Sequence, residues 1–202
     1  MAKIYAFVNQ KGGVGKTTSA ISLGAFIGLY GQRILLVDLD PQANATSSLG
    51  IDKHAIKNGT YEVLIGGHPA GPAILHNPQY KISILPASPS LAGAEIELIE
   101  MEHRERFLRN ALAPVADRYD YILIDCPPSL SLLTVNGLVA AKDGVVIPVQ
   151  CEYLALEGLG QLTQTIQRVR GSLFPELTVR GVVLTMFDSR TRLSMDVVQE
   201  VR

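Results

Sequence analysis

Near its start the chain carries a glycine-rich segment, "NQKGGVGKTT" (9–18), between an apolar run and a helical pattern. The run "KIYAFV" (3–8) is typical of a buried strand, and the helical pattern begins at Thr17 and extends to about Tyr30. Gly31 follows, where a left-handed helix cap is expected. A strand, a glycine loop and a helix in this order predict a phosphate-binding loop, in which backbone N–H groups and the helix N-terminus face an anion.

The rest of the chain alternates between short apolar strands and helical patterns. Further strands are predicted at 33–40, 81–88, 119–129, 144–150 and 178–187. Helical patterns are predicted around 61–65, 90–117, 132–141 and 154–172, and from about Leu193 onward. The mixed charges within 100–110 are interpreted as the solvated face of one of these helices. This order predicts an α/β fold of the P-loop NTPase type, with a mostly parallel, twisted sheet and helices on both faces.

Composition limits the possible partners and compartments. Eighteen basic residues against nineteen acidic ones leave a net charge near zero, so contact with nucleic acid would require a local patch. The two cysteines, Cys126 and Cys151, fit neither a zinc-site spacing nor a disulfide framework, and we expect them to be reduced thiols. No apolar run approaches the roughly 18 residues of a membrane span, and no secretory signal precedes the first strand. We expect a soluble, cytoplasmic protein with one domain over 1–202.

The glycine loop departs from the usual phosphate-loop pattern, G-x-x-x-x-G-K-S/T. Gly15, Lys16 and Thr17 supply its second half, but Gln10 stands where the first glycine is expected. The remaining glycines, Gly12 and Gly13, still allow backbone N–H groups to turn toward phosphate oxygens.

Each residue of the loop has a predicted role in binding a nucleotide. Lys16 is expected to contact the β- and γ-phosphates, Thr17 to ligate Mg²⁺, and Thr18 to contact the α-phosphate. The predicted cofactor-binding residues of this loop are Gly12, Gly13, Val14, Gly15, Lys16, Thr17 and Thr18.

Three carboxylates follow predicted strands at the same edge of the sheet. Asp38 and Asp40 lie two residues apart, so their side chains point to the same face and need a compensating cation. Asp125 ends the apolar run "YILID" and matches a Walker B aspartate, which holds Mg²⁺, usually through water. We predict that Thr17, Asp38 and Asp125 form the metal site, with Asp38 in a supporting position. Asp40 is predicted to orient the water that attacks the γ-phosphate.

With these residues in place, the chain resembles the ParA/Soj branch of the deviant-Walker ATPases, which are relatives of MinD. The resemblance spans most of the chain. The matching segments are "NQKGGVGKTT" (9–18), "LLVDLDPQANATSSLG" (35–50), "YDYILIDCPPSLSLLTVNGL" (119–138) and "GVVLTMFDSRTRLS" (181–194).

The resemblance implies an ATP- and Mg²⁺-dependent dimerisation switch with slow ATP hydrolysis. In this family two subunits sandwich two nucleotides, and the extra lysine, here Lys11, reaches the phosphates of the partner. Lys11 would then be both a cofactor-binding and a catalytic residue beside Lys16 and Asp40. The position of Lys11 before the wrapping glycines agrees with an outward side chain that acts like an arginine finger.

The resemblance also implies partners and a cellular location. ATP-bound ParA dimers bind DNA without sequence preference, and a ParB-like centromere-binding protein stimulates their hydrolysis during plasmid or chromosome partition. Arg190 matches a position associated with DNA binding, so we expect a nucleoid-associated protein. One departure is that the sequence stops at "VVQEVR" (197–202) within a predicted helix, whereas family members continue with a further strand and helices.

Three other functions remain open at this point. A MinD-like membrane-associated ATPase shares Lys11, Lys16, Asp38 and Asp40, but it would end in a basic amphipathic helix. A reductase resembling the nitrogenase iron protein needs cluster-facing cysteines, whereas Cys126 directly follows the predicted magnesium ligand. A partner protein that has lost turnover would keep the fold alone.

Overall fold

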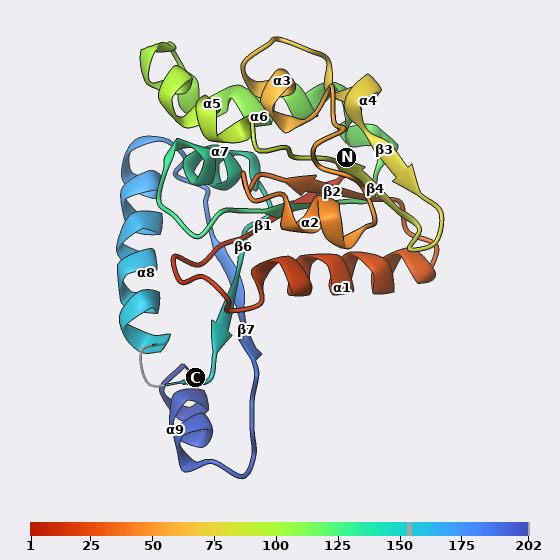
Figure 1. Ribbon diagram of the computed structural model, residues 1–202. Helices are drawn as coiled ribbons and strands as arrows, with labels where there is room; N and C mark the ends of the chain where they lie inside the picture. The colour runs from red at the N-terminus through yellow and green to blue at the C-terminus, as the bar shows by residue number, and fades with distance from the viewer. Residues whose placement is uncertain (153–154, 202) are drawn as a thin grey trace.

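The computed structural model describes residues 1–152 and 155–201 (Figure 1). Within them, a seven-stranded sheet with the order β3-β4-β2-β5-β1-β6-β7 forms the centre of the molecule. The strands are β1 (Lys3–Phe7), β2 (Ile34–Asp38), β3 (Leu75–Asn77), β4 (Ile82–Leu85), β5 (Tyr121–Asp125), β6 (Val145–Gln150) and β7 (Val179–Thr185). Neighbouring strands pair in parallel, except that β3 is antiparallel to β4.

Helices cover both faces of this sheet. The α-helices are α1 (Lys16–Leu29), α2 (Asn44–Ser48), α3 (Thr60–Leu64), α4 (Ala70–Ala73), α5 (Leu91–Glu97), α6 (Phe107–Leu112), α7 (Leu132–Ala140), α8 (Ala155–Ser172) and α9 (Arg192–Val201). Short 3₁₀ segments occur at η1 (Leu98–Glu100), η2 (Arg104–Arg106) and η3 (Ala113–Arg118). In Figure 1, α1 lies below the sheet and α3, α5, α6 and α7 lie above it. The predicted α/β fold is therefore confirmed.

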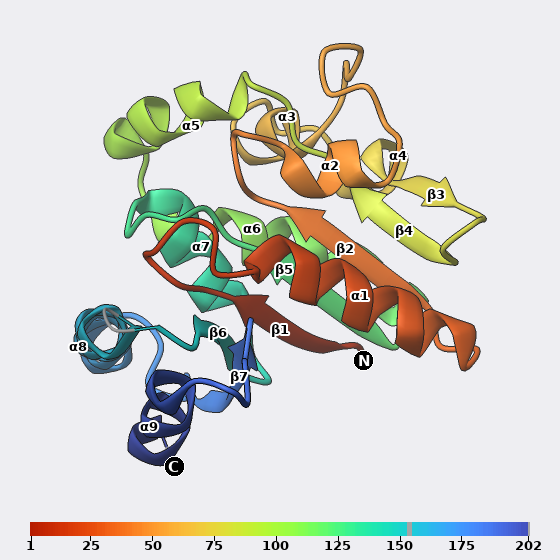
Figure 2. The same ribbon diagram turned by 60° about the horizontal axis from the view of Figure 1, so that its bottom comes forward.

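Alternate residues of the central strands build two hydrophobic layers. Ile34 and Leu36 of β2 face α1 and join its buried Ala20, whereas Leu35 and Val37 face the opposite layer. Figure 2 shows α1 lying over β5, between β1 and β2. Because both faces of β2 are covered, its residues form a continuous apolar run rather than an alternating one.

One predicted helix is wrong in its extent. The pattern over 90–117 breaks into α5, three 3₁₀ segments and α6, with His103 in a left-handed conformation (φ 55°) between them. Pro114 is the second residue of η3, where its missing N–H cannot support a continuing α-helix. The charges of 100–110 are therefore spread over turns and short helices, not along one solvated helix face. The edge strand β3 and the short helices α2 and α4 were not predicted.

The other predicted elements agree with the structure to within a few residues. The predicted helix at 154–172 corresponds to α8, although residue 154 lies outside the described residues. Gly31 adopts the expected left-handed conformation after α1, with φ 83°. None of the helices in the described part of the chain is both long and apolar enough to cross a membrane.

The register of the strands brings the predicted motifs to one edge. Asp38, at the end of β2, pairs with Asp125, at the end of β5, and Asp125 also pairs with Phe7, at the end of β1. The loop that leads from β1 into α1 starts at this same carboxyl edge (Figure 1). In parallel sheets this edge is where ligands bind.

Candidate nucleotide-binding site

The glycine loop adopts a backbone conformation that would be strained for most residues other than glycine. Gly13 and Gly15 have φ values of 76° and 85°, in the left-handed region that glycine enters without steric cost. Gly15 directly precedes the first turn of α1, so the loop ends at a helix N-terminus. The Thr185 hydroxyl, at the end of β7, donates a hydrogen bond of 2.8 Å to the carbonyl of Val14. This bond ties the loop to a second strand and limits its freedom.

A cleft of about 470 Å³ opens above this loop. Its lining combines loop glycines, hydroxyl groups, one lysine and one carboxylate. The lining residues are Gly12, Gly13, Gly15, Lys16, Thr17, Thr18, Asp40, Gln42, Asn44, Ser48, Pro128 and Met186. The structure thus brings most of the predicted phosphate-loop residues together with Asp40. A hollow with backbone N–H groups, an ammonium and hydroxyls can hold a polyphosphate.

Lys16 lies buried at the floor of the cleft, with 6% of its surface exposed. Burial lowers the pKa of its ammonium, and the neighbouring Asp125 and Asp40 carboxylates oppose this shift. The ammonium donates a hydrogen bond of 3.1 Å to the Lys11 carbonyl. A phosphate that binds in the cleft would therefore replace the Lys11 carbonyl as the acceptor for the Lys16 ammonium.

Asp38 is fully buried and already hydrogen-bonded. One carboxylate oxygen accepts from the Thr46 N–H (2.8 Å) and hydroxyl (2.7 Å), and the other accepts from the Asp40 N–H (3.2 Å). Burial raises the pKa of Asp38 to about 6, although the Thr46 bonds oppose the shift. Asp38 therefore braces the segment that carries Asp40 and Thr46.

Asp125 is as buried as Asp38, but its hydrogen bonding differs. Neither of its carboxylate oxygens has a hydrogen-bond partner among the described residues. Burial and the nearby Asp38 charge raise the pKa of Asp125 to about 8, while Thr17 and Lys16 beside it oppose the shift. Unpaired buried carboxylate oxygens next to a phosphate cradle and a threonine hydroxyl match the oxygen ligands that Mg²⁺ prefers. These residues fit a magnesium site.

Asp40 is the carboxylate that faces the cleft. One of its oxygens accepts a hydrogen bond of 2.9 Å from the Gln42 N–H, which fixes the side chain. The other oxygen makes no protein hydrogen bond within residues 1–152 and 155–201. Asp40 can therefore accept a hydrogen bond from a water molecule in the cleft.

Lys11 and Arg190 do not line the cleft, and each forms an ion pair outside it. The Lys11 ammonium pairs with Glu152, which follows the end of β6. The Arg190 guanidinium pairs with both carboxylate oxygens of Asp188, and 87% of its side chain is exposed. Sequence reasoning missed Glu152, because its separation of 141 residues from Lys11 leaves no local signal.

Asn9 and Thr46 are further residues that sequence reasoning missed. The Asn9 side chain accepts from the Lys11 N–H (3.0 Å) and donates to the Pro148 carbonyl in β6 (2.7 Å). Thr46 holds Asp38, as described above. Both residues lie in quoted motifs, but a polar residue in a motif does not reveal its distant partner.

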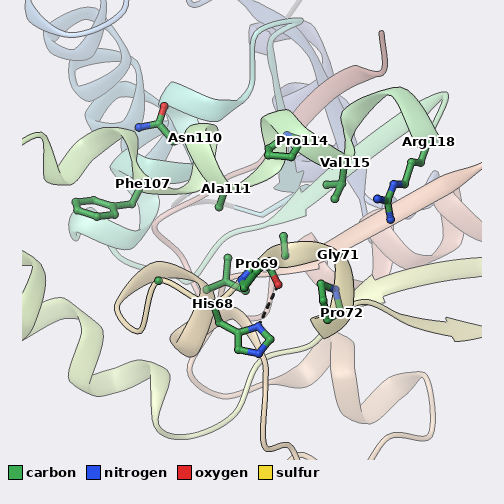
Figure 3. Close-up of a pocket in the computed structure, with 13 residues that line it drawn as sticks. His68, Pro69, Gly71, Pro72, Phe107, Asn110, Ala111, Pro114, Val115 and Arg118 are labelled. Carbon is green, nitrogen blue, oxygen red and sulfur yellow. Dashed lines mark hydrogen bonds between the residues drawn. The ribbon is translucent and has the colours of Figure 1, made fainter.

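A separate hollow of about 450 Å³ lies between α4 and the α6–η3 segment. Figure 3 shows His68, Pro69 and Pro72 facing Phe107, Ala111 and the Pro114–Arg118 segment across it. The residues that line this hollow include none of the predicted site residues and no carboxylate. It is therefore not part of the candidate site.

Asp38 and Asp125 make the stability of the nucleotide-free protein depend on pH. Their folded-state pKa values of about 6 and about 8 both exceed the ordinary value of 3.8. The folded state therefore holds protons that the unfolded chain releases, so the free energy of unfolding falls as the pH rises from about 4 to 8. In chelator, Asp125→Asn is expected to flatten this decline by at most about 1.4 kcal/mol per pH unit.

Urea unfolding at pH 5, 6, 7 and 8 measures this effect. Asp196→Asn, which changes an exposed carboxylate of α9, serves as the matched control and should retain the slope of the parent. Equal slopes for Asp125→Asn and the parent would contradict the raised pKa of Asp125.

Comparison with known proteins agrees with this geometry. A family model described as "AAA domain" matches residues 2–179. The sporulation initiation inhibitor protein Soj of Bacillus subtilis is 51% identical over 202 residues, covering all of this chain and 79% of that protein. The chromosome partitioning protein ParA of Myxococcus xanthus is 52% identical over 203 residues, covering all of this chain and 71% of that protein.

Solved structures also match over nearly the whole chain. A structure named cobyrinic acid a,c-diamide synthase, from Mycobacterium smegmatis with bound ADP and magnesium, has a TM-score of 0.95 and 44% identity. That match covers 100% of this chain and 81% of the other. A putative plasmid partition protein from Borrelia burgdorferi bound to AMPPNP has a TM-score of 0.85 and 28% identity, covering 98% and 81% of the two chains.

Proposed function

Because this chain belongs to the ParA/Soj family of partition ATPases, we propose that the cleft at the carboxyl edge of its sheet binds and hydrolyses MgATP. The protein is an ATPase of plasmid or chromosome partition, and its cofactors are ATP and Mg²⁺. The observation that carries the site proposal is the buried Asp125 carboxylate beside the phosphate loop, whose oxygens have no hydrogen-bond partner among the described residues.

The phosphate loop supplies the contacts to the nucleotide. Backbone N–H groups of residues 12–18, with the N-terminus of α1, surround the phosphates. Lys16 binds the β- and γ-phosphate oxygens, and Thr18 binds the α-phosphate. Thr17 and Asp125 hold Mg²⁺, which neutralises charge that develops on the phosphates.

Asp38 and Asp40 have different parts in this proposal. Asp38 supports the metal site indirectly, because its hydrogen bonds with Thr46 and Asp40 hold the segment beside it. Asp40 accepts a hydrogen bond from the attacking water and aligns it with the γ-phosphate. Burial of both carboxylates excludes bulk water and strengthens their interactions with nearby charges.

Lys11 is proposed to act in a second subunit. Lys11 belongs to the same loop as the phosphate-binding glycines, and its ammonium, once it leaves Glu152, would reach the phosphates of a facing copy and stabilise negative charge in the transition state, as an arginine finger does. Dimerisation would then depend on the γ-phosphate. A ParB-like partner is proposed to stimulate the slow hydrolysis, as implied by the resemblance to ParA.

A synthase activity and a MinD-like activity both lack comparable support. The synthase activity in the name of the Mycobacterium smegmatis structure is not proposed for this chain, since relatives about half identical to it carry partition names. These names also give no support to the MinD-like alternative.

The proposed switch is tested by comparing nucleotides. With Mg²⁺ and ATP or AMPPNP, sedimentation velocity should show a dimer, whereas ADP should leave a monomer. Phosphate release should require Mg²⁺ and stop in chelator. Identical sedimentation with ADP and AMPPNP would overturn the proposed switch.

The ATP-bound dimer is further proposed to bind DNA without sequence preference and to associate with the nucleoid. Arg190 supports this proposal because its guanidinium is exposed, but Asp188 already neutralises much of its charge. Phosphate contacts of this kind weaken as salt rises, since binding releases counterions from the DNA.

Arg190→Ala is expected to weaken DNA binding and to reduce the slope of log affinity against log salt by about 0.9 for each DNA phosphate that the guanidinium neutralises. Asp188→Asn should have the opposite effect on affinity, because it frees the guanidinium. Fluorescence anisotropy with a labelled duplex at several salt concentrations measures both. Arg170→Ala on α8 is the control, and a parental slope for Arg190→Ala would remove Arg190 from the DNA site.

A further inference from the structure

The ammonium group of Lys11 is held within its own subunit by a residue that lies far away in the sequence. Lys11 and the Glu152 carboxylate form an ion pair across 141 residues, and their side chains are 35% and 38% exposed. Both groups are therefore partly shielded from water. Their attraction is screened less than that of a fully exposed pair. Before Lys11 can reach a second subunit, this ion pair has to break.

Hydrogen bonds connect the backbone on each side of the ion pair to β6. The Asn9 side chain joins the Lys11 N–H to the carbonyl of Pro148 in β6. Glu152 follows β6 in a turn, where its N–H donates to the Gln150 carbonyl (2.8 Å). The segment that carries Lys11 and the segment that carries Glu152 are thus both attached to β6, which holds the two side chains near each other.

Lys16 connects this ion pair to the nucleotide. Its ammonium donates a hydrogen bond to the Lys11 carbonyl. Phosphate oxygens in the cleft would attract the same ammonium and take it from that carbonyl. Arrival of the triphosphate therefore removes one of the hydrogen bonds that hold the Lys11 backbone in place.

We infer that Glu152 is a positioning residue that restrains Lys11 in the free subunit and releases it when a partner's phosphates compete for the ammonium. This inference rests on the proposed action of Lys11 in a second subunit. It adds an opposing contribution, because breaking the Lys11–Glu152 ion pair subtracts from the free energy that the partner's phosphates gain when they bind the ammonium.

The expected size of the effect follows from the exposure of the pair. Partly exposed ion pairs shift an equilibrium by about 1.4- to 5-fold. A twofold-symmetric dimer breaks two such pairs, so the factors multiply to about 2- to 25-fold. Glu152→Gln keeps the size of the side chain and removes its charge, and it should tighten the AMPPNP-dependent dimer by this factor.

A double-mutant cycle tests the inference. The dimer dissociation constant is measured by sedimentation equilibrium with Mg²⁺ and AMPPNP for the parent, Glu152→Gln, Lys11→Ala and the double variant. Glu152→Gln should tighten the dimer only where Lys11 is present. Glu102→Gln, which changes an exposed carboxylate elsewhere, is the matched control and should have no effect. Circular dichroism and the thermal unfolding midpoint establish that each variant is folded.

The outcomes separate this inference from the proposed function. An unchanged or weaker dimer in Glu152→Gln would overturn the restraining role. Equal tightening with and without Lys11 would overturn it as well, since Glu152 would then act through general repulsion of phosphate. Parental dimerisation by Lys11→Ala would instead overturn the proposed action of Lys11 itself.

Discussion

Lys11→Ala is expected to weaken ATP-dependent dimerisation and to lower ATP hydrolysis by about three orders of magnitude. A cation that a second chain brings to the transferred phosphoryl group contributes about 10³- to 10⁵-fold to the rate in related phosphoryl-transfer systems, and alanine removes it. Lys16 remains in the same subunit, so nucleotide binding by the monomer should persist. Sedimentation velocity with AMPPNP, phosphate release and binding of a fluorescent ATP analogue measure the three properties.

Lys57→Ala is the matched control, because Lys57 is an exposed lysine away from the cleft. It should dimerise and hydrolyse ATP like the parent. Loss of nucleotide binding in Lys11→Ala would indicate that Lys11 acts within its own subunit. Parental dimerisation would exclude the proposed role in a second subunit.

Asp40→Ala is expected to lower hydrolysis by about 10²- to 10⁴-fold while ATP still binds, which is the range for loss of a general base or water-orienting group. Because chemistry would be blocked after assembly, the dimer should accumulate with ATP as it does with AMPPNP. Single-turnover phosphate release and sedimentation with ATP measure the two effects.

Asp196→Ala, which removes an exposed carboxylate of α9, should leave both measurements unchanged. Unchanged turnover in Asp40→Ala would exclude Asp40 as the water-orienting group. Loss of ATP binding would instead assign Asp40 a structural role, since the only hydrogen bond of its carboxylate within the described residues supports Gln42.

The three acidic residues of the site show how far sequence reasoning reached. Their positions at strand ends predicted a shared edge, and the register of β2 against β5 places Asp38 beside Asp125. Their different surroundings were not predictable. Thr46 lies eight residues from Asp38 and satisfies it, whereas nothing in the described residues satisfies Asp125. Hydrogen bonding of this kind depends on side-chain positions that strand patterns do not encode.

Local sequence patterns were enough to predict the α/β order, the phosphate loop and the edge at which the acidic residues gather. Those features follow from apolar periodicity, glycine conformation and the rules of parallel sheets, which act over short stretches of chain. Three features became visible only in the folded chain: the Asp125 oxygens have no partner among the described residues, Glu152 pairs with Lys11, and the helix predicted over 90–117 is interrupted around His103. Such features arise when distant segments compete for the same space and the same charges, so no local pattern contains them.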